Sequence, residues 1–190
     1  VDEREALVRL KGIADALLVH NRPIARPVDD SVVLVVAGRP ENHDRGAVSK
    51  SKPEVMMVRR ARGYAPQAIR WNGDATDGMA QGPILAMGGH LKNTVALLTG
   101  NRVVLSQHLG DLSTVEADRV FREAVEDLQR LLDVTPRAIA CDLHPDYRST
   151  SFARELAANL SVPLVPVQHH HAHVASCMAE HRLDGEVLGI

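Results

Sequence analysis

In the carboxyl-terminal half of the chain, apolar residues follow strand patterns and then alternating helix and strand patterns. The order of these patterns limits the folds that the chain can adopt. Three apolar runs that predict strands come first, at residues 83–89, 94–100 and 101–110. Turns with Gly88, Gly89 and Gly100 join them, which indicates a meander of three strands. Helical and strand patterns then alternate, at residues 111–134, 136–145, 149–160, 162–168, 170–183 and 186–190. The order predicts an α/β fold with a mixed sheet, right-handed crossovers and helices on both faces.

The amino-terminal part has one helical pattern and two strand patterns. Residues 2–20 predict an amphipathic helix whose apolar face comprises Ala6, Leu7, Leu10, Ile13, Ala14, Leu17 and Leu18. A β-branched run at 31–38 and an apolar piece at 55–66 predict strands. Residues 39–54 combine charge, Gly, Pro and Ser without periodicity and predict a surface loop. Turn formers over residues 65–81 predict a domain boundary.

Two helices of the second half carry candidate start signals. The helix at 111–134 has Ser113 and Thr114 as candidate caps. Its predicted apolar face comprises Val120, Ala124, Leu128 and Leu131. The segment at 149–160 begins with hydroxyl residues and predicts a short capped helix.

Composition excludes several classes of protein. With 45% hydrophobic residues, 24% charged residues and a net charge of −2, the chain is typical of a soluble globular protein and has no basic surplus for nucleic acid. No apolar run approaches the roughly 20 residues of a membrane span, and no signal-peptide pattern is present. Cys141 and Cys177 lie far apart, which fits a reducing cytoplasm. Because the chain lacks an initial Met and ends within an apolar run, we expect it to be part of a longer protein.

Four histidines within five positions, residues 169–173, form the strongest candidate site. On a helix, His169 and His173 lie one turn apart on one face, so both can bind one divalent ion. Two imidazoles and a carboxylate suit Zn²⁺ or Fe²⁺. His170 and His171 point elsewhere and can support the site by hydrogen bonding or meet a substrate. A zincin motif would require Glu at position 170, so a protease is disfavoured.

The turn after the first meander strand is a candidate anion site. Gly88 and Gly89 let the backbone approach a phosphate closely, and Lys92 adds a point charge. A strand-turn-strand phosphate loop is typical of the actin-like fold, whereas the Walker A pattern is absent. Taken alone, a surface hairpin explains the same residues.

Further polar residues lie near predicted strand ends. Arg59, Arg60 and Arg62 carry guanidinium groups that fit phosphate, although a solvated basic edge explains them as well. Four more polar side chains follow other strands, namely Asp111, Asp142, His144 and Asp146. At strand ends, acidic side chains can hold a metal or act as a base. Taken one by one, these residues are interpreted as turn formers and helix caps.

In combination, these segments resemble the HypF type of carbamoyltransferase, a maturation factor of [NiFe] hydrogenases. The matching segments follow one another in the family's order and spacing, at residues 14–33, 59–66, 88–112, 141–150 and 167–181. The patterns "GGxLKNT", "DxHPxY" and "QHHHAH" are the most specific. The resemblance covers nearly all of the chain.

The resemblance implies a domain organisation and an activity for each domain. Residues 1–66 would be the tail of a YrdC-like α/β domain, 67–80 a linker, and 81–190 the first, ribonuclease H-like part of an actin-like (ASKHA) domain. The YrdC-like domain would make carbamoyl-adenylate from carbamoyl phosphate and ATP. The actin-like domain would pass the carbamoyl group to the carboxyl-terminal cysteine of a HypE-type maturation protein, for synthesis of cyanide ligands.

The same resemblance implies roles for individual residues. His169 and His173 would bind the metal, Fe or Zn, with His170 and His171 in supporting or substrate-facing roles. Residues lining the adenylating site would be Ser31, Arg59, Arg60 and Arg62. Residues facing the second nucleotide site would be Gly88, Gly89, Lys92 and Asn93.

Two departures from the family pattern affect these expectations. The segment at 41–57 is longer than the family's usual link, and the acidic segment that supplies a carboxylate ligand would follow Ile190. We therefore expect these 190 residues alone to be inactive.

Other functions remain open. An O-carbamoyltransferase acting on a small molecule, or a tRNA threonylcarbamoyl transferase, would share the actin-like fold and an H-x-x-x-H pair. A third alternative is a metal-binding interaction module without catalysis.

Overall fold

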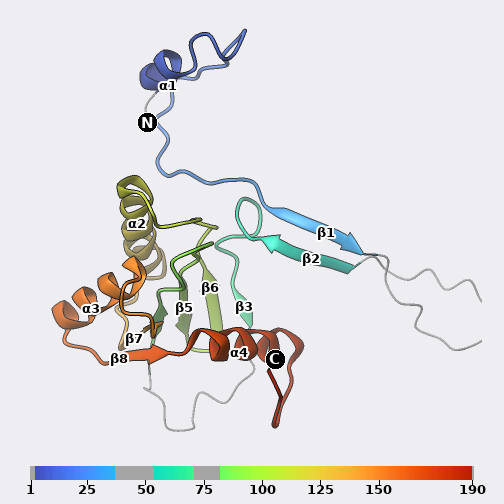
Figure 1. Ribbon diagram of the computed structural model, residues 1–190, viewed down its shortest axis with the longest axis vertical. Helices are drawn as coiled ribbons and strands as arrows, with labels where there is room; N and C mark the ends of the chain where they lie inside the picture. Colours follow the sequence, from blue (N-terminus) through green and yellow to red (C-terminus); the bar gives the residue numbers. More distant parts are fainter. Residues whose placement is uncertain (1–2, 37–53, 71–81, 190) are drawn as a thin grey trace, which may run out of the picture.

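The computed structural model describes residues 3–36, 54–70 and 82–189, which form a mixed six-stranded sheet, a two-stranded ribbon and four helices (Figure 1). The predicted loop at 39–54, apart from Glu54, lies outside the described residues, as do residues 71–80 of the predicted linker. No helix in the described ranges is long and apolar enough to cross a membrane.

The six-stranded sheet has the order β3-β6-β5-β4-β7-β8. In chain order its strands are β3 (Ile69–Arg70), β4 (Ile84–Ala86), β5 (Ala96–Thr99), β6 (Arg102–Leu105), β7 (Ala138–Asp142) and β8 (Leu164–Val167). Strands β4, β5 and β6 pair antiparallel as the predicted meander, whereas β7 pairs parallel with β4 and β8 parallel with β7. The predicted mixed sheet is confirmed. Strand β3 falls inside the predicted linker and pairs with β6 at the sheet edge.

One face of the sheet carries the hydrophobic core. Alternation along the strands turns Leu85, Leu97 and Ile139 to this face, where all three are fully buried. Helices α2 (Val115–Leu132) and α3 (Arg148–Leu160) supply the opposing side chains. Phe121 of α2 meets Phe152 of α3 edge to face, with ring centroids 5.6 Å apart. This contact joins the two helices on one face of the sheet.

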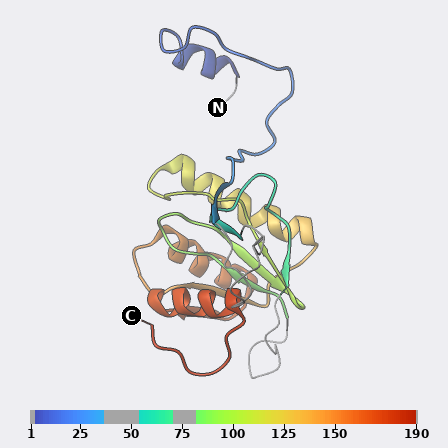
Figure 2. The ribbon, with the colours of Figure 1, turned by 90° about the vertical axis from the view of Figure 1, so that its right-hand side faces the viewer.

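The opposite face is covered in part by α4 (His169–His181). Ala86 and Ala140 pair with each other and point away from the core, and they share a cavity with Ala172 of α4. Figure 2 shows α4 on the near side of the molecule with α3 behind it. Helices on both faces are therefore confirmed, although α4 buries no residue fully.

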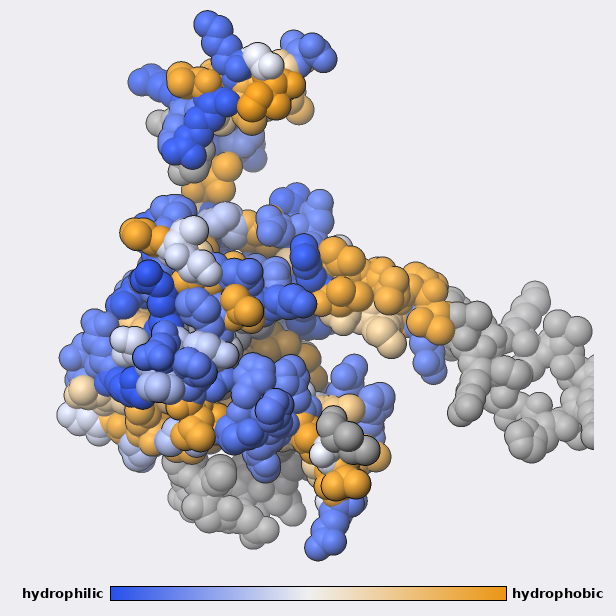
Figure 3. Space-filling view, viewed as in Figure 1, coloured by the Kyte–Doolittle hydropathy of each residue, from blue (hydrophilic) through white to orange (hydrophobic). Residues whose placement is uncertain are grey.

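The amino-terminal residues extend away from this body. Helix α1 (Glu3–Arg9) lies at the far end of an extended segment, and β1 (Val32–Val36) pairs antiparallel with β2 (Glu54–Arg59) in a projecting arm (Figure 1). Both predicted strands are confirmed. Figure 3 shows apolar side chains along the arm. The exposed apolar residues of the arm are Val32, Leu34, Val35, Val36, Val55, Met56 and Val58.

Four local predictions are wrong. The apolar face predicted for α2 includes Leu131, which is exposed, whereas Phe121 and Val125 are buried. The helix expected over 2–20 ends at Arg9: Gly12 has a left-handed φ of +83°, and the apolar side chains beyond it, such as Leu18, are exposed. Residues 186–189 form no strand. Helix α3 has Tyr147 at its N-cap without a side-chain cap bond. Thr114, in contrast, caps α2 as expected, because its Oγ1 accepts from the Ala117 N–H at 3.1 Å.

Candidate functional site

The histidine segment begins a helix directly at the carboxyl end of β8. Gln168 is the N-cap of α4, and its Oε1 accepts a hydrogen bond from the His171 backbone N–H at 2.8 Å. Because the helix starts at His169, the first turn carries His169 and the second carries His173 on the same side. Both side chains thereby reach the sheet edge where β7 ends.

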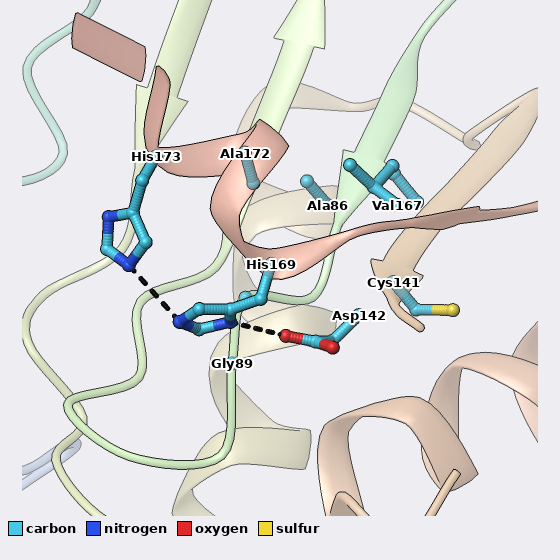
Figure 4. Close-up of a pocket in the computed structure, with 10 residues that line it drawn as sticks. Ala86, Gly89, Cys141, Asp142, Val167, His169, Ala172 and His173 are labelled. Atoms are coloured by element: carbon cyan, nitrogen blue, oxygen red, sulfur yellow. Dashed lines mark hydrogen bonds and ion pairs between the residues drawn. The ribbon is translucent and has the colours of Figure 1, made fainter. Parts of the chain in front are cut away.

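The two imidazoles face each other through their Nε2 atoms. His169 Nε2 and His173 Nε2 are 3.1 Å apart, and the ring centroids are 4.8 Å apart in an edge-on arrangement (Figure 4). Two imidazole nitrogens on one tetrahedral zinc ion are separated by about 3.3 Å, given bonds of roughly 2.0–2.1 Å. The spacing of this pair therefore suits a shared ion.

Asp142, the last residue of β7, holds the first of these rings. Its Oδ2 lies 2.6 Å from His169 Nδ1, and its Oδ1 accepts from the His144 backbone N–H at 2.9 Å. The Asp142 side chain is only 6% exposed. Burial acts to raise the pKa of Asp142, but the hydrogen bonds from His144 and His169 outweigh it, so that this pKa lies below its ordinary value. The carboxylate is thus charged at neutral pH.

The glycine turn closes the other side of the site. A cavity of about 270 Å³ is lined by the turn, the ends of β4, β7 and β8, and both histidines. A Cβ built on Gly89 would lie 3.5 Å from Cε1 of His169, which is van der Waals contact. The glycine turn therefore lies directly beside the His169 ring. The structure therefore brings Gly88, Gly89, His169 and His173 together in one cavity. Gly89, His169 and His173 are labelled in Figure 4.

Lys92 and Asn93 have different surroundings. Lys92 is exposed with a left-handed φ of 50°, and its backbone N–H donates to Asp111 Oδ1 at 2.9 Å. Asn93 is 1% exposed, and its Nδ2 donates to the carbonyls of Met87 at 2.9 Å and Gly89 at 2.6 Å. Asn93 thus shapes the turn from inside. The nucleotide contacts expected of both residues stay predictions.

Gly88→Ala is expected to destabilise this turn. Gly88 has a φ of +68°, and an added Cβ would lie 2.5 Å from the backbone oxygen of Thr94. Strain and clash together predict a loss of about 2–4 kcal/mol in the free energy of unfolding, measured by urea denaturation. Gly100→Ala is the matched control, because Gly100 has a φ of +57° but nothing within 4 Å of the added Cβ. Equal losses in the two variants would exclude the clash.

Ser31 and the arginine segment form a second group. The Ser31 hydroxyl donates to the Arg62 carbonyl at 2.9 Å and accepts from the Ala61 N–H at 2.8 Å. Arg60 Nη2 donates to the carbonyl of Gln67 at 2.9 Å. Arg62 Nη2 donates to the carbonyl of Val28 at 3.0 Å, and its Nε lies 3.4 Å from Asp30 Oδ1.

The guanidinium groups of Arg60 and Arg62 therefore bind backbone carbonyls of neighbouring chain segments. Arg59 lies in β2 opposite Val32. None of these residues lines the histidine cavity.

His170 and His171 are exposed and do not line the cavity. His170 Nδ1 lies 3.1 Å from Gln168 Nε2. The contact that sequence reasoning missed is Asp142 with His169. One sequence signal could have indicated it: Asp142 and His169 both lie at the ends of predicted strands, and the carboxyl ends of neighbouring parallel strands meet at one edge of a sheet.

Comparisons with known proteins identify the family. The family model of the HypF Kae1-like domain matches residues 79–180, more than half of the chain. The carbamoyltransferase HypF of Synechocystis sp. is 46% identical over 191 residues, and that of Rhizobium leguminosarum bv. viciae is 42% identical over 190 residues. Each match covers 100% of this chain and 22% of the relative, so the chain spans about a fifth of the relatives' length.

Comparison with solved structures leads to the same family. A crystal structure of full-length HypF in the phosphate- and nucleotide-bound form matches with a TM-score of 0.78 and 41% identity, over 100% of this chain and 26% of that one. HypF from T. kodakarensis matches with a TM-score of 0.76 and 34% identity, over 97% of this chain and 22% of that one. The chain belongs to the HypF family of carbamoyltransferases.

Proposed function

We propose that this chain is part of an enzyme that forms carbamoyl-adenylate from carbamoyl phosphate, ATP and water, with release of phosphate and pyrophosphate. The enzyme then transfers the carbamoyl group to a protein thiol, with release of AMP. The acceptor is the carboxyl-terminal cysteine of a HypE-type maturation protein, and the product serves cyanide-ligand synthesis for [NiFe] hydrogenases. The observation that carries the proposal is the His169–His173 pair at 3.1 Å, beside the glycine turn, in a chain of the HypF family.

The residues present fit a divalent metal ion, Fe or Zn. Two imidazole nitrogens converge, and His169 has a carboxylate on its far nitrogen, which is the usual support of a metal-bound histidine. Within the described ranges, no group of three or more His, Cys, Asp or Glu side chains could hold an ion. Further ligands would therefore come from water, substrate or polypeptide outside these ranges. When bound, the ion would neutralise phosphate charge and polarise the carbamoyl carbonyl.

The chain's own groups would orient the substrate around this pair. The backbone at Gly88 and Gly89 can approach a phosphate closely because no side chain intervenes, and Lys92, three residues after Gly89, can add positive charge. Apolar Ala86, Ala140 and their neighbours make the cavity floor largely nonpolar. A nonpolar floor strengthens electrostatic attraction between the site and an anionic ligand. The phosphate- and nucleotide-bound state of the matching full-length HypF supports an ATP-binding role.

The first half-reaction is proposed for the second group of residues. Ser31, Arg59, Arg60 and Arg62 would line the adenylating site, where guanidinium groups can bind phosphate oxygens. The acceptor thiol must stay reduced, so the reaction is proposed to take place in the cytoplasm.

Transfer of label identifies the acceptor. The enzyme that contains this chain is incubated with ATP, ¹⁴C-labelled carbamoyl phosphate and a HypE-type protein, and the label is located by peptide mapping. We expect it on the carboxyl-terminal cysteine, and a Cys→Ala variant of that partner should remain unlabelled. Label on a small-molecule hydroxyl or on tRNA would instead identify one of the related transferases and overturn the proposal.

A further inference from the structure

We propose that Asp142 is a positioning residue that fixes the tautomer of His169, so that the Nε2 lone pair of His169 faces His173. The proposal concerns the same site and rests on the proposed metal-binding function. A carboxylate only accepts hydrogen bonds, and Asp142 Oδ2 lies 2.6 Å from His169 Nδ1, so Nδ1 must carry the proton. A neutral imidazole has one proton, and Nε2 is therefore left with its lone pair.

Asp142 is held in place by contacts that do not involve His169. The hydroxyl of Thr150, a residue that is 1% exposed, donates to the backbone carbonyl of Asp142 at 3.0 Å. The His144 backbone N–H donates to Asp142 Oδ1 at 2.9 Å. The His144 ring in turn stacks on Tyr147 with centroids 4.2 Å apart and an interplanar angle of 7°. The carboxylate is thus preorganised before any ion binds.

The second ring depends on this choice of tautomer. His173 Nε2 lies 3.1 Å from His169 Nε2, so the two atoms cannot both carry protons. With Nδ1–H on His169, its Nε2 accepts a hydrogen bond from His173 in the free protein and offers a lone pair to a cation. If Nε2 of His169 carried the proton instead, that atom would have no lone pair to offer a cation. When a cation binds, His173 must likewise carry its proton on Nδ1.

Asp142→Asn reverses the tautomer without changing the shape of the side chain. The His144 N–H needs an acceptor, so the amide oxygen of Asn stays with His144 and its NH₂ faces His169. That NH₂ can only donate, which requires an unprotonated Nδ1 and moves the proton to Nε2. We expect affinity for Zn²⁺ to fall about 10–100-fold, with the melting temperature close to that of the wild type.

The tautomer is measured in the metal-free protein by long-range ¹⁵N–¹H correlation spectra, which report separately which ring nitrogen of His169 carries a proton. We expect Nδ1–H for His169 in the wild type and Nε2–H in Asp142→Asn. Calorimetric titration with Zn²⁺ gives the affinity. Asp146→Asn, the same change of charge four residues later in an exposed position, should keep both the wild-type tautomer and the wild-type affinity.

Each outcome bears on the positioning role separately from the metal site. Nε2–H in the wild type, which needs no variant, would overturn the role of Asp142, as would an unchanged tautomer in Asp142→Asn. A reversed tautomer in Asp142→Asn supports the role even if the wild type binds no Zn²⁺. In that last case the metal-binding proposal alone fails.

Discussion

The double variant His169→Ala, His173→Ala is expected to bind no Fe or Zn and to lose carbamoyl transfer by about 100–1000-fold or more. The two Nε2 atoms, 3.1 Å apart, are the converging donors of the cavity, and alanine removes both. Elemental analysis of the purified protein gives the metal content. Appearance of labelled carbamoyl on the partner protein gives the rate.

The control is His181→Ala at the other end of α4, an exposed histidine that does not line the cavity. It should leave metal content and transfer unchanged. Equal metal content in the wild type and the double variant would show that His169 and His173 do not bind the metal. A fall in the melting temperature of the double variant with transfer preserved would instead mean that the histidines only stabilise the fold.

The second half of the chain could be predicted because its signals are local and agree with one another. Apolar alternation, turn glycines and the Thr114 cap each act within a few residues, and together they fix the order of strands and helices. The pairing of β5 with β6 then follows from the short turn at residues 100–101, and the segment with the glycine turn returns β4 to β5 to complete the meander. For the same reason, the four-residue spacing of His169 and His173 was enough to predict a facing pair.

The partner of His169 could not be predicted from spacing, because it comes from another strand. Asp142 is 27 positions away and reaches the ring only through the register of β7 and β8. As an isolated residue, Asp142 reads as a turn former, and its bond to His144 shows that it is one. Asp142 is therefore both a turn former and the partner of His169. Asn93 is similar, since its burial under the turn depends on strands that close around it.

The helix predicted over residues 2–20 and the face predicted for α2 are wrong for another reason. Periodicity measures what a segment could bury, whereas stability depends on whether a partner surface exists. The apolar positions of residues 10–20 have no such surface among the described residues, and Gly12 turns the chain out of the helix. In α2 the buried positions include Phe121 and Val125, and Leu131 is 55% exposed, so the predicted face was shifted around the helix.

Phe121→Ala is expected to cost about 3–5 kcal/mol in the free energy of unfolding. Phe121 is fully buried and packs edge to face on Phe152, so the change leaves a cavity between α2 and α3 and removes an aromatic contact. Urea denaturation followed by circular dichroism measures the loss. A variant already unfolded without urea would also meet the expectation.

Two further variants separate packing from helix propensity. Val115→Ala lies on the same helix but is 82% exposed, so it should change the free energy of unfolding by less than about 0.5 kcal/mol. Phe121→Leu keeps most of the volume and should lose less than Phe121→Ala, because the remaining cavity is smaller. A loss below about 1 kcal/mol for Phe121→Ala would show that packing of Phe121 between α2 and α3 does not stabilise the fold as expected. In that case β7 would be held in the sheet chiefly by backbone pairing. The cavity at the carboxyl end of β7 would then not depend on packing against α2.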